Sequence, residues 1–433
     1  MKILKFGGSV LRGSDGFAKM VHILKECKEE TIVVISAFST TTQQLVDASI
    51  LASQGQFTKA NESLELLVES FLFTIEELIE NSAKRSNIVS MIELGKKEVQ
   101  NLLEGLSITK ELTERTLDAV MSFGEFFSLH IVSHFLREQG VQLESIDARQ
   151  FLITNEEYGK ASPIRSETKE RLHSVVLPAL QRSSIVITQG FIGRTQSGET
   201  TTLGKESSNT TATLLASLLH ANEVIIYTNV DGIRSADPKR IPNTKVLPLL
   251  TYKDASIMAH EGVKILHSTT IEQLIGTTIP LTIRSLFTAN GESTIIQSEI
   301  NDASYEQIKG AKVVIEHINV FKIQVQSSTN FSMQRYVGFQ LVHQEHHNDF
   351  DTYYLLQTGA TDASFVQKTS METLSGVSII STATFDTSTL RKVIRTLSQT
   401  QLHLFSIQQN LIFAVFNNSS NVDVVQTIHD SIL

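Results

Sequence analysis

The chain has 433 residues, enough for roughly two to four domains, each able to bury its own core. Hydrophobic residues make up 41% and charged residues 19%, as in soluble globular proteins, and the net charge of −9 argues against general binding to nucleic acids or acidic membranes. The single cysteine, Cys27, excludes a disulfide within the chain. We see no signal peptide and no apolar run of about 18 residues, so a cytoplasmic protein with no membrane partner is expected.

The N-terminal residues predict a strand, a glycine turn and a helix. A short apolar strand over 3–6 is ended by Gly7-Gly8, and apolar residues then recur at helical spacing over 17–24. Residues 31–36 are a β-branched run typical of a strand buried on both faces. Strand, helix and strand in this order predict a parallel sheet, and hence an α/β fold.

The next segment, about 45–120, predicts a helical insertion between strands. Residues 56–94 carry one apolar helical stripe. A second helical run covers 97–139, with interruptions expected near Gly105 and at 122–125. This insertion either packs as a plain helical layer or covers a site as a lid.

After the insertion the pattern alternates and then changes character. Strands are predicted over 184–188, 223–228 and 280–284, and helices over 210–220 and 254–276. A polar, weakly patterned stretch near 290–306 predicts a linker, and the tail mixes short strands and helices, ending with a strand over 411–416 and a helix over 422–432. We therefore expect a first domain over 1–295 and a second, α+β region over 306–433 with room for two small modules.

Glycine-rich and polar motifs recur along residues 1–290, and Lys5, Ser36 and Thr228 lie at the ends of predicted strands. In open α/β sheets, ligands bind beyond the carboxyl ends of the strands, where backbone amides and lysines attract phosphate. The lysines in these motifs could supply local positive charge within an acidic chain. The five motifs are Lys5-Phe6-Gly7-Gly8-Ser9, Ser122-Phe123-Gly124-Glu125, Gly190 to Gly204, Tyr227 to Lys239, and Gly262-Val263-Lys264-Ile265-Leu266-His267.

Together and in this order over residues 1–290, these motifs resemble those of aspartokinases in the amino-acid kinase family. The resemblance implies a three-layer sandwich around a mainly parallel sheet, followed by tandem ACT-like α+β modules. It implies phosphoryl transfer from MgATP to the β-carboxylate of L-aspartate, giving 4-phospho-L-aspartate, the first step of lysine, threonine and methionine biosynthesis. It also implies a homodimer through the C-terminal region.

The resemblance further implies roles for single residues. Lys5 and Asn209 fall on catalytic positions, where Lys5 would neutralise the transferring phosphate. Mg²⁺ would be carried by the nucleotide, with no metal site on the protein. The implied substrate-binding residues are Ser36, Thr42, Glu125 and Lys205, and the implied nucleotide-binding residues are Lys5, Gly7, Gly8, Ser9, Thr228, Asn229, Arg234, Lys239 and Lys264.

The loop after the threonine run departs from the family pattern. The family has Arg-Gly-Gly-Ser-Asp where this chain has Lys205-Glu206-Ser207-Ser208-Asn209, so an arginine fork and an aspartate are lost. Three hypotheses stay open at this point. The chain is a working aspartate kinase, or a degenerate paralogue that binds nucleotide or amino acid as a regulatory partner, or a kinase for a different carboxylate or carbamate.

Two further features are interpreted as structural. Six potential metal ligands lie between His343 and Asp351, but their spacing matches no zinc pattern, and we interpret them as a solvated hairpin loop. Cys27 is interpreted as a packed or surface thiol rather than a nucleophile. The tail also lacks the glycine-rich effector loops of lysine-binding ACT domains, so feedback by lysine or threonine is not expected.

Overall fold

The chain divides into two compact units, which are described separately. The first comprises Met1–Gly232, Pro248–Ser256 and Ile265–Glu299, and the second comprises Ile233–Leu247, Ile257–Lys264 and Ile300–Leu433. The domain boundaries at 295 and 306 stay a prediction. The computed structural model describes residues 1–204, 206–263, 267–288, 291–298, 312–326, 339–346, 350–357, 371–381, 385–398, 400, 402–408, 411–417 and 421–432.

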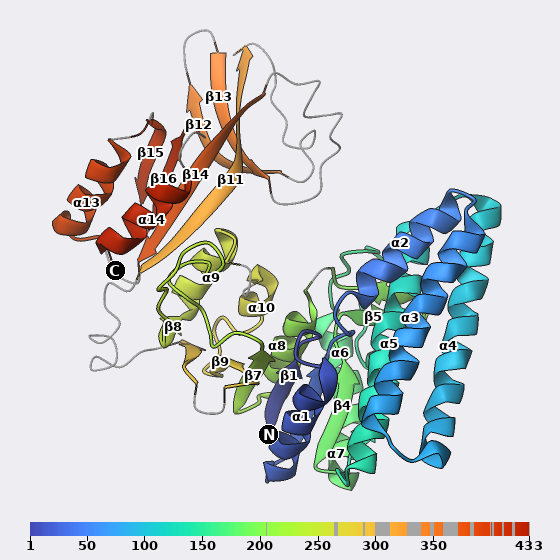
Figure 1. Ribbon diagram of the computed structural model, residues 1–433. Helices are drawn as coiled ribbons and strands as arrows, with labels where there is room; N and C mark the ends of the chain where they lie inside the picture. Colours follow the sequence, from blue (N-terminus) through green and yellow to red (C-terminus); the bar gives the residue numbers. More distant parts are fainter. Residues whose placement is uncertain are drawn as a thin grey trace. The chain divides into compact units, whose positions relative to one another are not determined.

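An eight-stranded sheet forms the centre of the first unit (Figure 1). Its strand order is β3-β4-β2-β1-β7-β9-β10-β8, and every pair is parallel except β9 with β10. The prediction of a mainly parallel sheet is therefore confirmed. The strands are β1 (Lys2–Phe6), β2 (Thr31–Ile35), β3 (Glu144–Ser145), β4 (Ile185–Gln189), β7 (Glu223–Thr228), β8 (Leu249–Thr251), β9 (Leu281–Ser285) and β10 (Ser293–Gln297).

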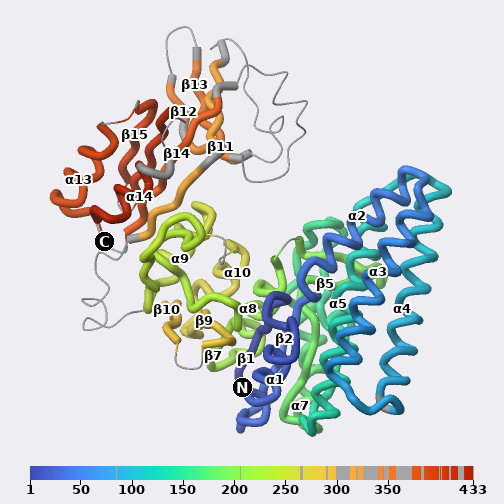
Figure 2. The backbone as a smooth tube through the Cα atoms, in the orientation of Figure 1, coloured from blue at the N-terminus to red at the C-terminus, as the bar shows by residue number. Residues whose placement is uncertain are grey.

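Helices surround this sheet, and their order along the chain is easiest to follow in the tube view (Figure 2). They are α1 (Gly13–Glu26), α2 (Thr41–Ser53), α3 (Phe57–Leu78), α4 (Ser82–Thr109), α5 (Glu114–Glu138), α6 (Arg165–Arg171), α7 (Leu177–Arg182), α8 (Ser208–Leu219), α9 (Tyr252–His260) and α10 (Ser268–Glu272). A 3-10 turn, Ala148–Gln150, follows β3, and a π-helical turn, Leu172–Val176, joins α6 to α7.

Side chains alternate between the two faces of β1, and this alternation positions the site. Leu4 and Phe6 are fully buried in one large core cluster with Phe17 of α1 and Phe135 of α5. Because successive strand residues point to opposite faces, Lys5 projects from the other face of the sheet. Helix α8 packs on β1, β2 and β7.

The helical insertion consists of α2 to α5, which pack on one another as long rods (Figure 1). The interruptions predicted near Gly105 and at 122–125 are wrong, because α4 and α5 run through these positions. The chain breaks instead at 110–113, where Lys110 has φ 58°. By length and composition α5 could cross a membrane, but 72% of its most apolar window is buried inside the protein, as in a core helix.

The prediction of one continuous helix over 254–276 is also wrong. Helix α9 ends at His260, and Gly262 then adopts φ 94°, a left-handed conformation that stops a helix. Residues 264–266 lie outside the described residues, and α10 begins only at Ser268.

The second unit contains a six-stranded antiparallel sheet together with helices, which agrees with the α+β pattern of the tail. The strand order is β12-β13-β11-β14-β16-β15, and the closing strand and helix occur where the sequence predicts them. The elements are β11 (Lys312–Gln326), β12 (Phe339–His346), β13 (Phe350–Gln357), β14 (Met371–Ser381), α13 (Thr387–Leu397), β15 (Leu402–Gln408), β16 (Leu411–Phe416) and α14 (Asn421–Ile432).

The cluster of potential ligands between His343 and Asp351 lies on a hairpin. His346 of β12 pairs with Asp351 of β13, so the predicted hairpin is confirmed. However, His343 and Glu345 are part of strand β12 rather than of a loop. Residues 347–349 lie outside the described residues.

Candidate active site

Lys5 ends the apolar part of β1 as a buried cation. Its side chain is only 8% exposed, and no carboxylate of the described residues lies within ion-pair distance of it. Burial lowers the pKa of Lys5 to about 8, against the opposing influence of the carboxylates of Glu206 and Glu125. A cation held this way remains available for an external anion.

Glu125 lies on α5 and is buried as deeply as Lys5, with 3% exposure. Its Oε1 accepts a hydrogen bond from the backbone N–H of Ala37 at 3.2 Å, whereas its buried Oε2 has no partner among the described residues. Burial raises the pKa of Glu125 to about 8, although the Ala37 hydrogen bond and the charge of Lys5 act in the opposite direction. An unpaired buried acceptor of this kind calls for an external donor.

The glycine pair brings the ends of three strands together. The N–H of Gly7 donates to the carbonyl of Tyr227 at 3.2 Å, which joins the β1 loop to β7. A Cβ on Gly7 would lie 3.3 Å from Nζ of Lys5, and one on Gly8 would lie 2.1 Å from the carbonyl oxygen of Ala37. A side chain at Gly8 therefore cannot fit, and its absence lets the loops after β1 and β2 touch.

The remaining predicted residues of the first unit lie on the same loops or next to them. Ser36 follows β2 and is half-buried, and its N–H donates to the carbonyl of Phe6 at 3.3 Å. Ser9 is exposed, and Thr42 is half-buried in the first turn of α2.

At the end of β7, Thr228 and Asn229 are joined by a side-chain contact. The hydroxyl of Thr228 donates to Oδ1 of Asn229 at 3.4 Å, and the Asn229 side chain is exposed. Both residues directly follow the β7 segment that bonds to Gly7, so they share the strand-end region with the glycine pair.

The altered loop contains two left-handed backbone positions. Glu206 adopts φ 61° although it is not a glycine, and Gly204 adopts φ 89°. The hydroxyl of Ser207 donates to the carbonyl of Gly204 at 2.7 Å and closes the loop. Asn209 follows in the first turn of α8, and its buried Oδ1 has no partner among the described residues.

Four of the predicted site residues are not found beside Lys5 and Glu125 in the described part of the first unit. Arg234 and Lys239 belong to the second compact unit, where Nε of Arg234 donates to the hydroxyl of Thr244 at 2.7 Å and Lys239 is exposed. Lys205 and Lys264 lie outside the described residues.

Helix α5 contributes two residues that the sequence reasoning missed. Ser128, one turn after Glu125, accepts a hydrogen bond from the N–H of Phe38 at 3.1 Å. Asp118 is fully buried two turns before Glu125. Its carboxylate accepts hydrogen bonds from the N–H of Thr202 at 2.9 Å and from the hydroxyl of Thr202 at 2.6 Å. The signal was present, because these residues share one face of an otherwise apolar helix at helical spacing.

With this geometry in place, comparison with known proteins decides the family. The family model described as "Amino acid kinase family" matches residues 1–285. The chain belongs to the amino acid kinase family. The resemblance of its five motifs is thereby confirmed, and the relatives with similar sequences are aspartokinases.

Among these relatives, the lysine-sensitive aspartokinase 3 of Escherichia coli is 30% identical over 290 residues, which cover 65% of this chain and 61% of that protein. The aspartokinase of Chlamydia muridarum is 28% identical over 302 residues, covering 69% and 64%. A chloroplastic bifunctional aspartokinase/homoserine dehydrogenase of Arabidopsis thaliana is 30% identical over 297 residues, covering 67% and 32%. The matches thus span less than two thirds of these relatives.

Solved structures extend the likeness of fold to both units. Escherichia coli aspartokinase III in complex with aspartate and ADP superposes with a TM-score of 0.83 at 22% identity, covering 100% of this chain and 99% of that one. The same enzyme in complex with lysine and aspartate gives a TM-score of 0.80 at 24% identity, covering 100% and 99%. The fold is therefore that of an amino acid kinase followed by ACT-like α+β modules.

Proposed function

We propose that this chain is an aspartate kinase, which transfers the γ-phosphoryl group of MgATP to the β-carboxylate of L-aspartate to give 4-phospho-L-aspartate. The observation that carries the proposal is the burial of Lys5 on β1 and of Glu125 on α5, where Glu125 is bonded to the loop after β2, in a chain whose relatives are aspartokinases. One group of the pair offers a positive charge and the other offers a free acceptor. A zwitterionic amino acid and a phosphate together need both.

The substrate would bind through its two charged ends. The unpaired Oε2 of Glu125 is placed to accept hydrogen bonds from the ammonium group of aspartate. Ser36 and Thr42 flank the same loop and offer hydroxyls to the substrate, and Lys205 would attract a carboxylate as a point charge.

The nucleotide would bind along the strand ends, where phosphoryl transfer depends on positioning and on charge neutralisation. Lys5 would neutralise the transferring phosphoryl group, while the amides of Gly8 and Ser9 bind it. The N–H of Gly7 is bonded to Tyr227, so Gly7 would contribute by leaving space beside Nζ of Lys5 for the phosphate. Asn209 would position Lys5 by accepting a hydrogen bond at its free Oδ1. Thr228, Asn229, Arg234, Lys239 and Lys264 complete the proposed nucleotide-binding set.

Mg²⁺ enters this proposal bound to the phosphates of ATP, where it supplies further charge neutralisation. Among the described residues, no three His, Cys, Asp or Glu side chains gather into a metal site. The protein residues named above would then orient the phosphates rather than the metal.

A hydroxylamine assay tests the activity, because an acyl phosphate product is trapped as a hydroxamate. We expect product with ATP, Mg²⁺ and L-aspartate, and a fall of about 10²- to 10³-fold in kcat/KM for Lys5→Met or Glu125→Gln. Arg391→Gln, an exposed charge on α13, should behave like the unmodified chain. Absence of hydroxamate at high enzyme concentration, or better turnover with another acid, would exclude the proposal.

The whole-protein properties are proposed with the activity. We infer a cytoplasmic homodimer that assembles through the C-terminal region and acts in lysine, threonine and methionine biosynthesis. Lysine is part of one complex of Escherichia coli aspartokinase III, which supports the link to this route. Light scattering of the full chain should give twice the mass of 48.0 kDa, and a monomer at micromolar concentration would contradict the dimer.

A further inference from the structure

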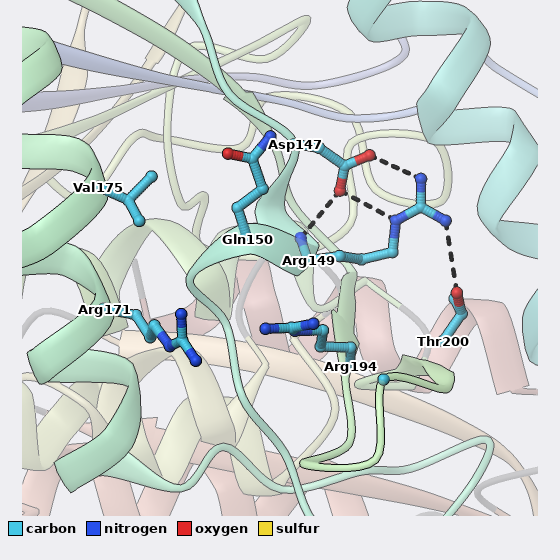
Figure 3. Close-up of a pocket in the computed structure, with 8 residues that line it drawn as sticks. Asp147, Arg149, Gln150, Arg171, Val175, Arg194 and Thr200 are labelled. Carbon is cyan, nitrogen blue, oxygen red and sulfur yellow. Dashed lines mark hydrogen bonds and ion pairs between the residues drawn. The ribbon is translucent and has the colours of Figure 1, made fainter.

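A second polar pocket lies at the edge of the sheet, beyond the end of β3 and away from Lys5. Its volume is about 560 Å³, and it is lined mainly by Asp147, Arg149, Gln150, Arg171, Arg194 and Thr200 (Figure 3). A volume in this range holds a small metabolite. In the sheet order, β4 and β2 separate β3 from the strand that carries Lys5.

Among the described residues, one of the three arginines in this pocket, Arg149, has an ion-pair partner. Asp147 binds Arg149 through two hydrogen bonds, from Nε at 3.0 Å and from a terminal nitrogen at 2.6 Å. Arg149 also reaches the hydroxyl of Thr200 at 3.4 Å. Both oxygens of Asp147 are bonded to Arg149, so this carboxylate does not pair with Arg171 or Arg194.

Arg171 and Arg194 point toward one another across the pocket, turned away from the Asp147–Arg149 pair (Figure 3). Nε of Arg194 is buried and has no hydrogen-bond partner among the described residues. Two like charges that face each other repel, and an anion bound between them would offset this repulsion.

Asp147 is the one carboxylate among the residues that line the pocket. Of two glutamates close to these residues in the sequence, Glu199 pairs with Arg115 at 2.7 Å, and Glu167 accepts a hydrogen bond from Gln196. Three arginines and one aspartate thus leave an excess of two positive charges in the pocket of a chain whose net charge is −9.

The backbone that presents these side chains is itself unusual. Arg171 is the last residue of α6 and directly precedes the π-helical turn Leu172–Val176. Single π-turns are rare and are frequently found at functional sites. Arg194 and Thr200 come from the facing strands of a hairpin, β5 (Ile192–Arg194) and β6 (Thr200–Thr202), which fixes their separation.

We propose that this pocket binds a small oxyanion with two negative charges, either a phosphate group or a dicarboxylate, between Arg171 and Arg194. Planar guanidinium groups match the paired oxygens of both anions. The site is separate from the proposed active site, and the inference does not rest on the proposed kinase activity.

Calorimetric titration of the full chain with inorganic phosphate and, separately, with succinate tests the site. We expect saturable binding of at least one anion, weakened about 10- to 100-fold by Arg171→Gln and by Arg194→Gln. Arg391→Gln is the matched control and should bind like the unmodified chain. Binding of phosphate alone would identify phosphate esters as the ligand class, and binding of succinate alone would identify dicarboxylates.

A fourth variant, Lys5→Met, separates this pocket from the proposed active site and should keep the binding. Arg171 is exposed, so its variant should fold even if Arg194→Gln does not, and circular dichroism checks both. The proposal is overturned if neither anion binds, if Arg171→Gln leaves a folded chain with unchanged affinity, or if Lys5→Met abolishes binding.

Discussion

At the scale of single residues, Lys5 and Glu125 are placed for binding at the expense of stability. Each is buried, and each has its pKa moved toward its neutral form, which indicates that burial penalises the charges more than their mutual attraction compensates. Stability of the fold does not explain why two such groups are buried. Binding of a ligand explains it, because complementary charges on the ligand offset the free-energy cost of burying Lys5 and Glu125.

The first prediction follows from the raised pKa of Glu125. In the unfolded chain this group ionises near its model value of 4.5, and in the fold it ionises at about 8. The folded state therefore holds a proton that the unfolded state has lost, so the free energy of unfolding falls as pH rises from 4.5 to 8. We expect Glu125→Gln to raise the free energy of unfolding at pH 8 by about 1–2 kcal/mol while reducing activity.

Urea unfolding between pH 5 and 8 measures this effect. The slope of the free energy of unfolding against pH should be shallower in Glu125→Gln than in the unmodified chain. Glu69→Gln, an exposed position on α3, is the control and should change neither the slope nor the stability. Equal slopes in all three proteins would show that Glu125 ionises normally in the fold.

A second prediction concerns protons released on substrate binding. At pH 7 Glu125 is mostly protonated, and an ammonium group beside its Oε2 would lower its pKa. Aspartate binding should then release about one proton. Calorimetry in two amine buffers of different ionisation enthalpy counts the protons. Release that persists unchanged in Glu125→Gln would assign the proton to another group.

At the scale of elements, α5 organises the site from one face. Asp118 holds strand β6 and the turn at Gly159, whereas Glu125 and Ser128 hold the loop after β2. Helical spacing aligns all three side chains, so one rigid helix fixes loops that are far apart in the sequence. The close contact of Gly124, whose Cβ would lie 3.2 Å from that of Ala37, lets the helix approach the loop.

Removing Asp118 tests this organising role. Asp118→Ala would leave the N–H groups of Gly159 and Thr202 and the hydroxyl of Thr202 without their acceptor, in a fully buried place. We expect a loss of about 3 kcal/mol in unfolding free energy, together with a lower kcat because β6 leads into the loop before Asn209. Thermal unfolding and steady-state kinetics measure both. Asp47→Ala, an exposed aspartate on α2, should change neither.

The sequence predicted the mainly parallel sheet well because strands and their ends depend on local patterns, whereas the roles of the site residues stay predictions. The apolar runs of β1 and β2 and the glycines after them specify strand ends within a few residues. Two helix boundaries could not be predicted in the same way. Gly105 and Gly124 resemble helix breaks, but a glycine within a helix is tolerated at a modest cost, and both helices continue through them. The break lies instead at Lys110, which adopts φ 58° although it is not a glycine.

At the scale of the whole molecule, the second unit contains more than the C-terminal region. Residues 233–247 and 257–264 belong to it, and Ala236 and Ile241 share a core cluster with Val314 of β11. Nothing in the sequence of these segments announces such partners, because contacts at long sequence separation leave no local pattern. The segments include Arg234 and Lys239, which are therefore held by the core of the second unit.

Two buried histidines help to fix these segments. Nε2 of His429 on α14 lies 3.1 Å from the hydroxyl of Ser235. Nε2 of His317 on β11 lies 2.8 Å from the hydroxyl of Ser378, which donates to Oε2 of Glu261 at 2.6 Å. A neutral His317 can donate its Nε2–H to the hydroxyl of Ser378, which in turn donates to Glu261. The imidazole therefore keeps this hydrogen bond without a positive charge.

The last prediction uses the pKa of His317, which burial lowers to about 4 although the Glu261 carboxylate is 3.9 Å away. The unfolded histidine takes up its proton near pH 6.5, whereas the folded one does so only near pH 4. The second unit should therefore lose stability as pH falls from 6.5 to 4, at on the order of 1 kcal/mol per pH unit.

His317→Gln should flatten this dependence of stability on pH even if it lowers stability at pH 7. Urea unfolding of the full chain, followed by a probe attached to α14, measures the slope. His22→Gln, an exposed histidine on α1, should leave it unchanged. A slope that stays as steep in His317→Gln would place the acid sensitivity elsewhere in the chain.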